Sequence, residues 1–326
     1  MLFVGRRDVE ALLPLRDCID LMEGTLRNLA EGKSAQPLRS VMTTLSGTGQ
    51  LALMPAQLGE AQTLGVKAVS VFPGNRRIGL EGHQGVVILF DHQTGAVTAI
   101  MDAGAITAIR TAAVTAVATR ALSDVDAGTL VVLGAGTQAK WSIKAIAQVR
   151  RLRSVRIWSR TSASSQSLAS LLRDELGHDG IIAVSDPAEA VADADIVVTA
   201  TTSSTPILHR AWIRGPILVN AIGACVPTAR ELDGATIRDA RFIVDSRESA
   251  LAESGDLMLA VHDGEVPDAM QLLELGDILT GAVPSHVADA TLTVFESLGL
   301  GAEDVAAAGY IYEAAVKSGA GARLSL

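Results

Sequence analysis

Apolar residues recur at two different spacings in the first third of the chain. In residues 17–32, DCIDLMEGTLRNLAEG, they follow three- and four-residue intervals, which predicts an amphipathic helix. Residues 66–72 and 85–102 are rich in β-branched residues and predict strands, the second a hairpin that turns at HQTG. Residues 103–122, rich in Ala and Thr with apolar residues at helical spacing, predict a long helix that leads into the next part of the chain.

From Thr129 onward, short apolar runs alternate with helical stretches. The runs are continuous in Val, Ile and Leu, which is typical of parallel strands buried on both faces. They are TLVVLG (129–134), VRIWSR (155–160), IIAVS (181–185), ADIVVTAT (194–201), PILVNAIG (216–223) and ARFIVDS (240–246). This alternation predicts an α/β fold with a Rossmann-type, doubly wound parallel sheet. The tail after about Val294, FESLGLGAEDVAAAGYIYEAAVKSG, predicts a capped helical segment that returns to the first domain.

The length of 326 residues favours two domains, because a domain usually spans about 100–200 residues. We place an α+β domain at residues 1–115 with 296–326, and the Rossmann domain at residues 116–295. A composition of 48% hydrophobic and 19% charged residues is typical of a globular protein. The formal net charge of −9 argues against a nucleic-acid or anionic-membrane partner, since both require clustered Lys and Arg.

Targeting and metal signals are missing from the sequence pattern. The N-terminus has no apolar core followed by a small-residue cleavage site, and no uninterrupted apolar stretch reaches the roughly 18–20 residues that span a bilayer. The two cysteines, Cys18 and Cys225, exclude a disulfide framework, and the six histidines show no metal-binding spacing. We therefore expect a cytoplasmic protein without a bound metal.

Residues 134–139, GAGTQA, match the GxGxxG/A pattern that binds a dinucleotide pyrophosphate at a helix N-terminus. The pattern alone is weak, because an ordinary glycine-rich turn also fits it. Its context strengthens the assignment, since it follows a Val/Leu strand and opens a helix. The predicted binding residues in this turn are Gly134, Gly136, Thr137, Gln138 and Ala139.

The next predicted strand ends in Ser159, Arg160 and Thr161 rather than in the acidic residue that would bind an NAD ribose. An arginine with two hydroxyls can hold a 2′-phosphate, so we predict NADPH and keep NADH as the alternative. A solvated arginine at a strand end is the other interpretation. The cofactor-binding set also includes Thr201 and Ile222, at the ends of the segments ADIVVTAT and PILVNAIG.

Three cations of the first domain lie in apolar or turn-rich stretches: Arg39, Lys67 and Arg110. Burying a lysine in a core strand is costly without an anionic partner, so the three could clamp a substrate carboxylate. Alternatively, they pair with structural carboxylates such as Asp91 or Asp102, or extend to solvent.

At these residues the chain resembles the ornithine cyclodeaminase and mu-crystallin family, over essentially its whole length. The matching segments are 54–56 (MPA), 65–67 (GVK), 72–75 (FPGN), 83–87 (HQGVV), 90–91 (FD), 94–95 (TG), 106–108 (ITA), 110–113 (RTAA), the glycine turn, 220–223 (NAIG), 230–233 (RELD) and 253–256 (ESGD). The resemblance implies a homodimer whose α+β domain, completed by C-terminal residues, binds substrate and forms the interface. It also implies that Arg39, Lys67 and Arg110 hold the α-carboxylate of the substrate.

Family members that cyclise ornithine resemble one another in an aspartate two residues beyond the NAxG segment, where this chain has Cys225. A neutral thiol is a poor substitute for a carboxylate base. Those members also carry a glutamate just before the Met-Pro pair, where this chain has Leu51-Ala52-Leu53. The mu-crystallin branch of the family also lacks the aspartate, and it is similar to this chain in residues 158–161 as well. This resemblance implies that the protein reduces cyclic ketimines with NADPH.

We therefore expect an NADPH-dependent oxidoreductase that reduces pyrroline-2-carboxylate to L-proline and piperideine-2-carboxylate to L-pipecolate, with Lys67 and Cys225 as the candidate catalytic residues. Cys225 would lie near the imine carbon, either to transfer a proton or as a small residue that makes room. The alternatives are an ornithine cyclodeaminase, an alanine-type dehydrogenase and a non-catalytic protein that binds a small ligand.

Overall fold

The computed structural model describes residues 1–286 and 291–325. The chain divides into two compact units, the first formed by residues 1–110 and 300–326 and the second by residues 111–299. The second unit is thus an insertion between two segments of the first.

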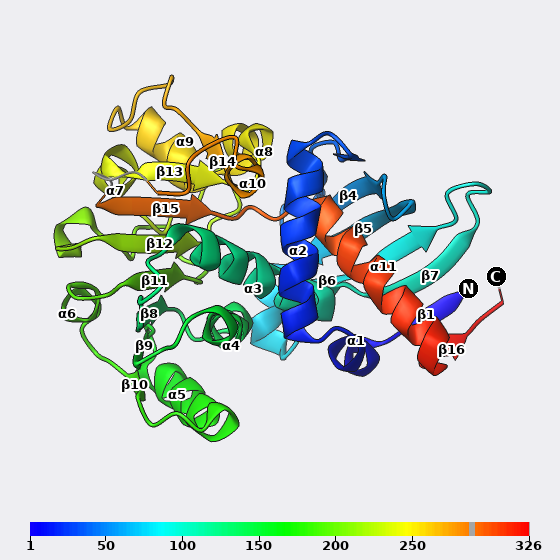
Figure 1. Cartoon of the computed structure of the whole chain (residues 1–326), viewed down its shortest axis with the longest axis horizontal. Helices are drawn as coiled ribbons and strands as arrows, with labels where there is room; N and C mark the ends of the chain where they lie inside the picture. Colours follow the sequence, from blue (N-terminus) through cyan, green and yellow to red (C-terminus); the bar gives the residue numbers. More distant parts are fainter. Residues whose placement is uncertain (287–290, 326) are drawn as a thin grey trace. The chain divides into compact units, whose positions relative to one another are not determined.

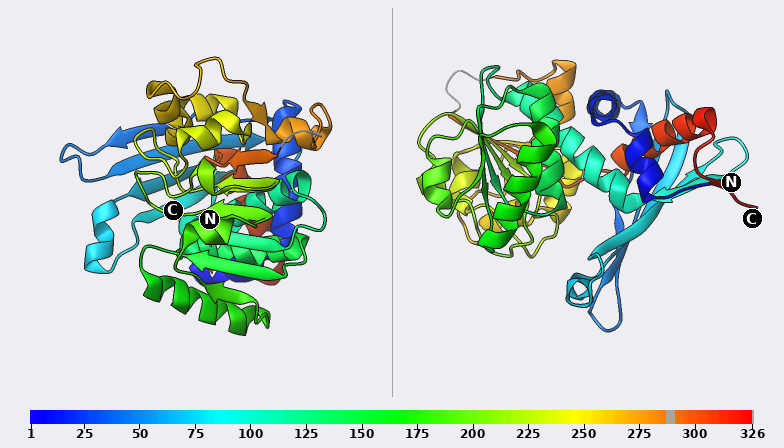
Figure 2. Two further views of the ribbon diagram at one scale, coloured as in Figure 1. Left: turned by 90° about the vertical axis from the view of Figure 1, so that its left-hand side faces the viewer. Right: turned by 90° about the horizontal axis from the view of Figure 1, so that it is seen from below.

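The first unit contains a mixed β-sheet with the strand order β16-β1-β7-β6-β5-β4-β2, and β3 pairs with β4. Its strands are β1 (Leu2–Val4), β2 (Ser34–Ala35), β3 (Ser40–Thr43), β4 (Gln50–Leu58), β5 (Thr63–Val71), β6 (His83–Phe90), β7 (Val97–Asp102) and β16 (Ala322–Arg323). Its helices are α1 (Arg6–Leu12), α2 (Leu15–Ala30), the 3-10 helix η1 (Pro73–Ile78) and α11 (Gly301–Ser318). Figure 2 shows β4, β5 and β6 as one long twisted ribbon.

Helix α11 covers this sheet. It packs against β4, β5 and β6, and α2 lies alongside it (Figure 1). Nearly all of its N-terminal half is buried, including the small residues of the segment GAEDVAAA. Small side chains let the helix approach the sheet closely: an added Cβ at Gly301 would lie 2.9 Å from the Met54 carbonyl oxygen. The C-terminal segment is therefore an integral part of the first unit.

The second unit contains an all-parallel sheet with the order β10-β9-β8-β11-β12-β15-β13-β14. Its strands are β8 (Thr129–Leu133), β9 (Ser154–Trp158), β10 (Ile181–Ala183), β11 (Ile196–Thr199), β12 (Ile217–Ala221), β13 (Arg241–Val244), β14 (Leu273–Glu274) and β15 (Leu292–Glu296). Its helices are α4 (Thr137–Val149), α5 (Ser162–Leu176), α6 (Pro187–Val191), η2 (Arg210–Trp212), α7 (Gly234–Asp239), α8 (Arg247–Glu253), α9 (Gly255–His262) and α10 (Leu275–Thr280).

Both faces of the parallel sheet are buried. Leu130 and Val132 of β8 join one apolar cluster with residues of α4 and α5, whereas Val131 and Leu133 join a second cluster on the other face. Figure 2 shows helices on both sides of this sheet. Burial on both faces explains why the strands read as continuous apolar runs, and it confirms the predicted α/β fold.

Helix α3 (Ala103–Leu122) runs from the first unit into the second. It is long and apolar enough to cross a membrane by length and composition, but 83% of its most apolar window is buried. Such burial is typical of the core helix of a folded domain.

The sequence prediction for the segment after about Val294 is wrong in part. The pattern predicts a helical segment there, but Leu292–Glu296 forms strand β15. This strand pairs with β12 on one side and with β13 on the other. Only Gly301–Ser318 is helical. The run LTVFE is short and directly precedes a helical pattern, so its periodicity alone does not separate it from the helix.

Gly134 makes the tight turn after β8 possible. Its φ is +135°, and an added Cβ would lie 2.4 Å from the carbonyl oxygen of Ala200, the residue directly after β11. Any other residue would be strained there and would push β8 and β11 apart. By contrast, Gly136 has φ −94°, and an added Cβ would meet no described atom within 4 Å.

We predict that Gly134→Ala lowers the free energy of unfolding by about 1–3 kcal/mol, because it forces a strained backbone against Ala200. Urea unfolding without cofactor, followed by circular dichroism, measures this. Gly136→Ala is the matched control and should unfold close to the wild-type midpoint, because the lower entropy of the unfolded chain offsets the poorer N-cap. Equal midpoints for the two variants would contradict the assignment.

Candidate functional site

Two cations and two carboxylates meet in the interior of the first unit. Lys67 Nζ donates to Oδ1 and Oδ2 of Asp304 at 3.1 and 3.2 Å. Arg110 donates through Nε to Asp304 Oδ1 at 3.0 Å and through Nη1 to Glu303 Oε2 at 2.5 Å. All four side chains are at most 5% exposed. Asp304 therefore serves as the shared counterion of both buried cations.

Three different elements bring these residues together. Lys67 lies in the middle of β5, paired with Met54 of β4 and Val87 of β6, and Arg110 lies on α3. Asp304 lies in the first turn of α11, where a negative charge is favoured by the helix dipole. The preceding Glu303 also accepts a hydrogen bond from the Leu300 backbone at the start of that helix.

Burial lowers the pKa of the Lys67 ammonium from its usual 10.5 to about 8. Asp304 acts in the opposite direction, whereas the positive charges of Arg110 and Arg39 lower the pKa further. Arg39, which is half-buried, thus lies within electrostatic reach of Lys67. The pKa of Lys67 is consequently lower than that of an ordinary surface lysine.

The structural partners of these cations differ from those suggested by sequence. Asp91 instead accepts hydrogen bonds from Gln93 and Thr94 in the β6–β7 turn, and Asp102 accepts one from the Ala105 amide at the start of α3. Sequence reasoning missed Glu303 and Asp304. Their signal is two adjacent acidic residues among the small apolar residues of the segment GAEDVAAA, where burial requires cationic partners.

The glycine turn of the second unit has the geometry of a phosphate site. Gly136 is the N-cap of α4, Thr137 and Gln138 open the helix, and Ala139 is fully buried against the sheet. The helix N-terminus offers backbone N–H groups to an anion, and the missing Cβ at Gly136 leaves room for it. The residues present therefore fit a dinucleotide pyrophosphate.

The segment after β9 leads into α5. Ser159 Oγ donates to the Thr161 carbonyl oxygen at 2.6 Å, and Thr161 is the N-cap of the helix. Arg160 is exposed and forms no ion pair within the described residues. A hollow of about 430 Å³ lies beside this segment, lined by Ala135, Ala163, Ser164, Ser167, Leu168 and Leu171. The hollow thus connects the glycine turn to the first turns of α5.

The remaining predicted residues lie at the carboxyl edge of the same sheet. Thr201 follows β11, and Ile222, which directly follows β12, is buried and donates its backbone N–H to the Thr199 carbonyl oxygen. Cys225 is partly buried and packs against the apolar core of the second unit. It therefore belongs to a different unit from Lys67 and Arg110.

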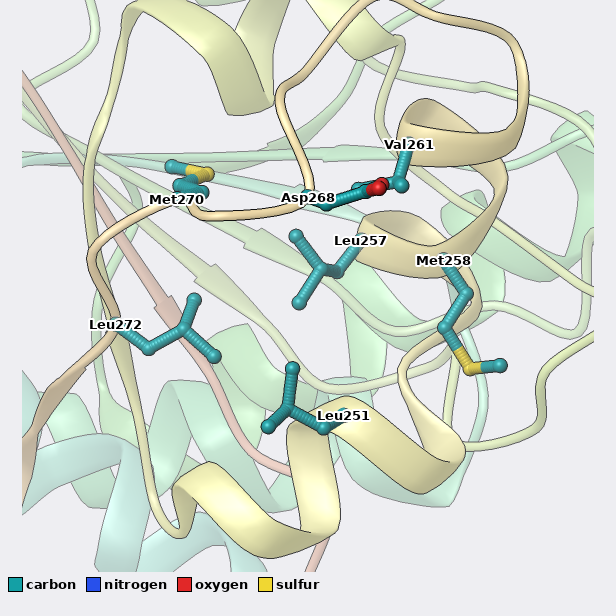
Figure 3. A pocket seen from close by; sticks show the side chains of 7 residues that line it. All are labelled: Leu251, Leu257, Met258, Val261, Asp268, Met270 and Leu272. Atoms are coloured by element: carbon teal, nitrogen blue, oxygen red, sulfur yellow. The ribbon is translucent and has the colours of Figure 1, made fainter.

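A separate apolar cavity of about 270 Å³ lies against α8 and α9. Figure 3 shows its lining of Leu251, Leu257, Met258, Val261, Asp268, Met270 and Leu272. None of the predicted site residues contributes to it, so we assign it no part in cofactor binding.

A model of the ornithine cyclodeaminase/mu-crystallin family matches residues 2–319 of this sequence. The chain belongs to this family. Ketimine reductase mu-crystallin of Mus musculus is 36% identical over 295 residues, which cover 90% of each protein.

Several solved structures resemble the whole chain, among them a reductase and a dehydrogenase. Thermococcus litoralis Δ1-pyrroline-2-carboxylate reductase, in complex with NADH and L-proline, has a TM-score of 0.95 and 32% identity, covering 99% of this chain and 100% of that one. An archaeal alanine dehydrogenase dimer with bound NAD has a TM-score of 0.91 and 29% identity, covering 100% and 99%. These findings confirm the predicted family and an NAD(P)H-dependent oxidoreductase acting on C–N bonds.

We predict that the contribution of Lys67 to stability rises with pH. With a pKa of about 8 in the folded chain and 10.5 when unfolded, Lys67 binds more protons in the unfolded state between these values. The free energy of unfolding therefore increases with pH across this window.

Urea midpoints of wild type and Lys67→Met, compared from pH 7 to pH 10, measure this effect. The difference, wild type minus variant, should grow above pH 8. Lys317→Met, at an exposed lysine of α11, is the control and should give a difference that stays flat. A flat or falling difference for Lys67→Met would refute the assignment.

Proposed function

We propose that the protein is an NADPH-dependent reductase of cyclic ketimine carboxylates, converting pyrroline-2-carboxylate to L-proline and piperideine-2-carboxylate to L-pipecolate. The observation that supports this proposal is the convergence of cations in the first unit. Lys67 and Arg110 are buried side by side on Asp304, and Arg39 lies within electrostatic reach of Lys67. Cations gathered in this way are suited to hold the carboxylate of an imino acid.

Two sets of residues have separate roles in the proposed mechanism. Arg39, Lys67 and Arg110 hold the substrate carboxylate, and the glycine turn and α5 hold the cofactor. When bound, the reduced nicotinamide supplies a hydride to C2 of the imine. Fixing the carboxylate leaves the ring only a limited choice of orientations, which favours attack at C2.

Lys67 is the proposed source of the proton on the imine nitrogen. A protonated imine accepts hydride more readily than a neutral one, and an acid with a pKa of about 8 is protonated at neutral pH yet can release its proton. The hydride and this proton together give the saturated amine.

Cys225 disfavours the cyclodeaminase alternative. Cyclisation of ornithine requires a base that takes a proton from the side-chain amine, and a thiol at neutral pH performs this poorly. The position before the Met-Pro pair also lacks a carboxylate, since Leu51, Ala52 and Leu53 occupy it. Imine reduction needs neither group, so Cys225 is best explained as a small residue beside the reacting carbon.

An alanine-type dehydrogenase is the second candidate. A 2-oxo acid such as pyruvate carries one carboxylate, which the same three cations could bind, and the archaeal relative with bound NAD is an alanine dehydrogenase. Reductive amination additionally requires ammonia, so the two candidates differ in their need for a free amine.

We further propose a cytoplasmic homodimer. On the face of the first sheet opposite the buried residues of β4, apolar side chains remain exposed, namely Met42, Leu51 and Leu53. Contiguous exposed apolar side chains of this kind are typical of a protein interface. A second copy of the chain would bury them.

We predict that the purified protein oxidises NADPH when mixed with either cyclic imine at neutral pH, without added ammonia. Absorbance at the nicotinamide band measures the rate. Pyruvate with ammonia and ornithine with NAD⁺ serve as parallel substrates. Turnover of either of these, with none of the imines, would overturn the proposal.

We predict that Arg160→Ala lowers kcat/KM for NADPH by about tenfold or more, since it removes a charge-assisted bond to the 2′-phosphate. Steady-state rates with varied NADPH and NADH measure this, and NADH is the internal control because it lacks that phosphate. A similar loss with both cofactors, or comparable wild-type kcat/KM for the two, would contradict an NADPH preference.

A further inference from the structure

Glu231 is a fully buried carboxylate at the carboxyl edge of the parallel sheet, and both of its oxygens accept hydrogen bonds. Oε1 accepts from the backbone N–H and the hydroxyl of Thr201, each at 2.6 Å. Oε2 accepts from the backbone N–H of Gly223 at 3.0 Å. One side chain thereby ties together the segments that follow β11 and β12.

Gly223 packs directly against the Glu231 carboxylate. An added Cβ there would lie 2.4 Å from Glu231 Oε2 and 2.5 Å from the Thr201 carbonyl oxygen. The β12 segment can therefore approach Glu231 and Thr201 only because residue 223 has no side chain. The three residues form a unit in which each fixes the position of the other two.

A second buried carboxylate holds Glu231 itself. Asp256 Oδ1 accepts hydrogen bonds from the backbone N–H groups of Glu231 and Leu232 at 2.8 and 2.7 Å. Asp256 lies in the first turn of α9, whose N-cap residue Ser254 donates to both oxygens of Glu296 at the end of β15. The segments 230–233 and 253–256, which had no assigned role, thus form one support.

Burial raises the pKa of the Glu231 carboxyl, but its hydrogen-bond donors act in the opposite direction. Because these donors all point at the two oxygens, they require acceptors at both positions. Burial, reinforced by the charge of Glu231, raises the pKa of Asp256 to about 8. The network is therefore built around acceptor oxygens at Glu231, which an amide cannot fully replace.

We propose that Glu231 is a positioning residue for the nicotinamide half of the cofactor: it fixes the backbone at Thr201 and Ile222-Gly223, on which that half rests. The proposal depends on the cofactor assignment under the proposed function. In the strand order β9-β8-β11-β12, the direction of the crossovers reverses beside β8, and ligands of parallel sheets bind outside the carboxyl ends at such a point. A pyrophosphate held at the turn after β8 would leave the ends of β11 and β12 to hold the nicotinamide half.

The position of Gly223 also affects Cys225. Cys225, the candidate residue beside the imine carbon, lies only two residues after Gly223. A displaced Gly223 would therefore move Cys225 as well as the nicotinamide. Glu231 thus controls both sides of the hydride transfer without contacting either reactant.

Glu231→Gln tests the proposal, because its NH₂ group would face an N–H donor in place of one acceptor oxygen. We expect NADPH to bind about tenfold more weakly, whereas adenosine 2′,5′-bisphosphate, which lacks the nicotinamide half, keeps its affinity within about threefold. We also expect kcat for imine reduction to fall. Calorimetry gives both dissociation constants at a temperature where circular dichroism shows the variant folded, and NADPH fluorescence gives the first of them independently.

Asp195→Asn is the matched control. Asp195 accepts backbone hydrogen bonds from Gly128 and Thr129, both at 2.8 Å, at the opposite, amino edge of the same sheet. Its loss should lower the melting temperature without changing the ratio of the two affinities. If Glu231→Gln does the same, with an unchanged ratio, Glu231 is merely structural and the proposal fails.

A second variant keeps the proposal testable if Glu231→Gln does not fold. Gly223→Ala pushes the same segment away from Glu231 and Thr201, and should weaken NADPH selectively in the same manner. An unchanged affinity ratio in the folded Gly223→Ala protein would overturn the proposal. If the wild type binds neither ligand, the cofactor assignment itself is wrong. If the wild type binds both ligands and the variants bind them equally well, only the proposed role of Glu231 is wrong.

Discussion

The ion cluster of Lys67, Arg110 and Asp304 constrains the architecture of the first unit. A lysine in the middle of a sheet and an arginine on a core helix cannot remain buried without a counterion, and the loss of one partner from such a group costs about 3–5 kcal/mol. The counterion comes from α11, 237 residues beyond Lys67 in the chain. The C-terminal helix must therefore return to the first sheet, and the parallel sheet is inserted between the two segments.

The same cluster connects stability with the proposed chemistry. Asp304 pairs with both Lys67 and Arg110, and burial lowers the pKa of the Lys67 ammonium to about 8. The carboxylates make the burial of these cations possible. The proposed role of the same cations is to hold the carboxylate of the substrate.

In the second unit, buried carboxylates accept hydrogen bonds from backbone N–H groups. At its carboxyl edge, Glu231 and Asp256 serve as acceptors for backbone N–H groups that the strands leave without partners. Loops that end parallel strands have no regular hydrogen-bond ladder, so side chains must hold them. Fixed loops are what a dinucleotide site requires, because its affinity comes from backbone groups placed before the ligand binds.

Local patterns explain which features could be predicted. Strands β8 to β13, helix α3 and the glycine turn follow from runs and spacings within about 20 residues, which depend on the faces that each element buries. Strand β15 was missed because its short apolar run adjoins a helical pattern. The carboxyl edge was only partly predicted: Thr201 and Ile222 were named from their strands, whereas Glu231 lay in the matching segment 230–233, to which no role was assigned.

The sequence by itself determined the parallel sheet, the dinucleotide turn and the presence of cations that require partners, since each depends on residues close together in the chain. Only the tertiary structure decided which residues are the partners of these cations. Lys67 and Arg110 contact Asp304. Glu231 contacts Thr201 and Gly223. These residues are too far apart in the sequence for a periodic pattern to predict the contacts. The physical reason is that a buried charge selects its counterion by distance in the folded chain, and that distance exists only after the elements have packed.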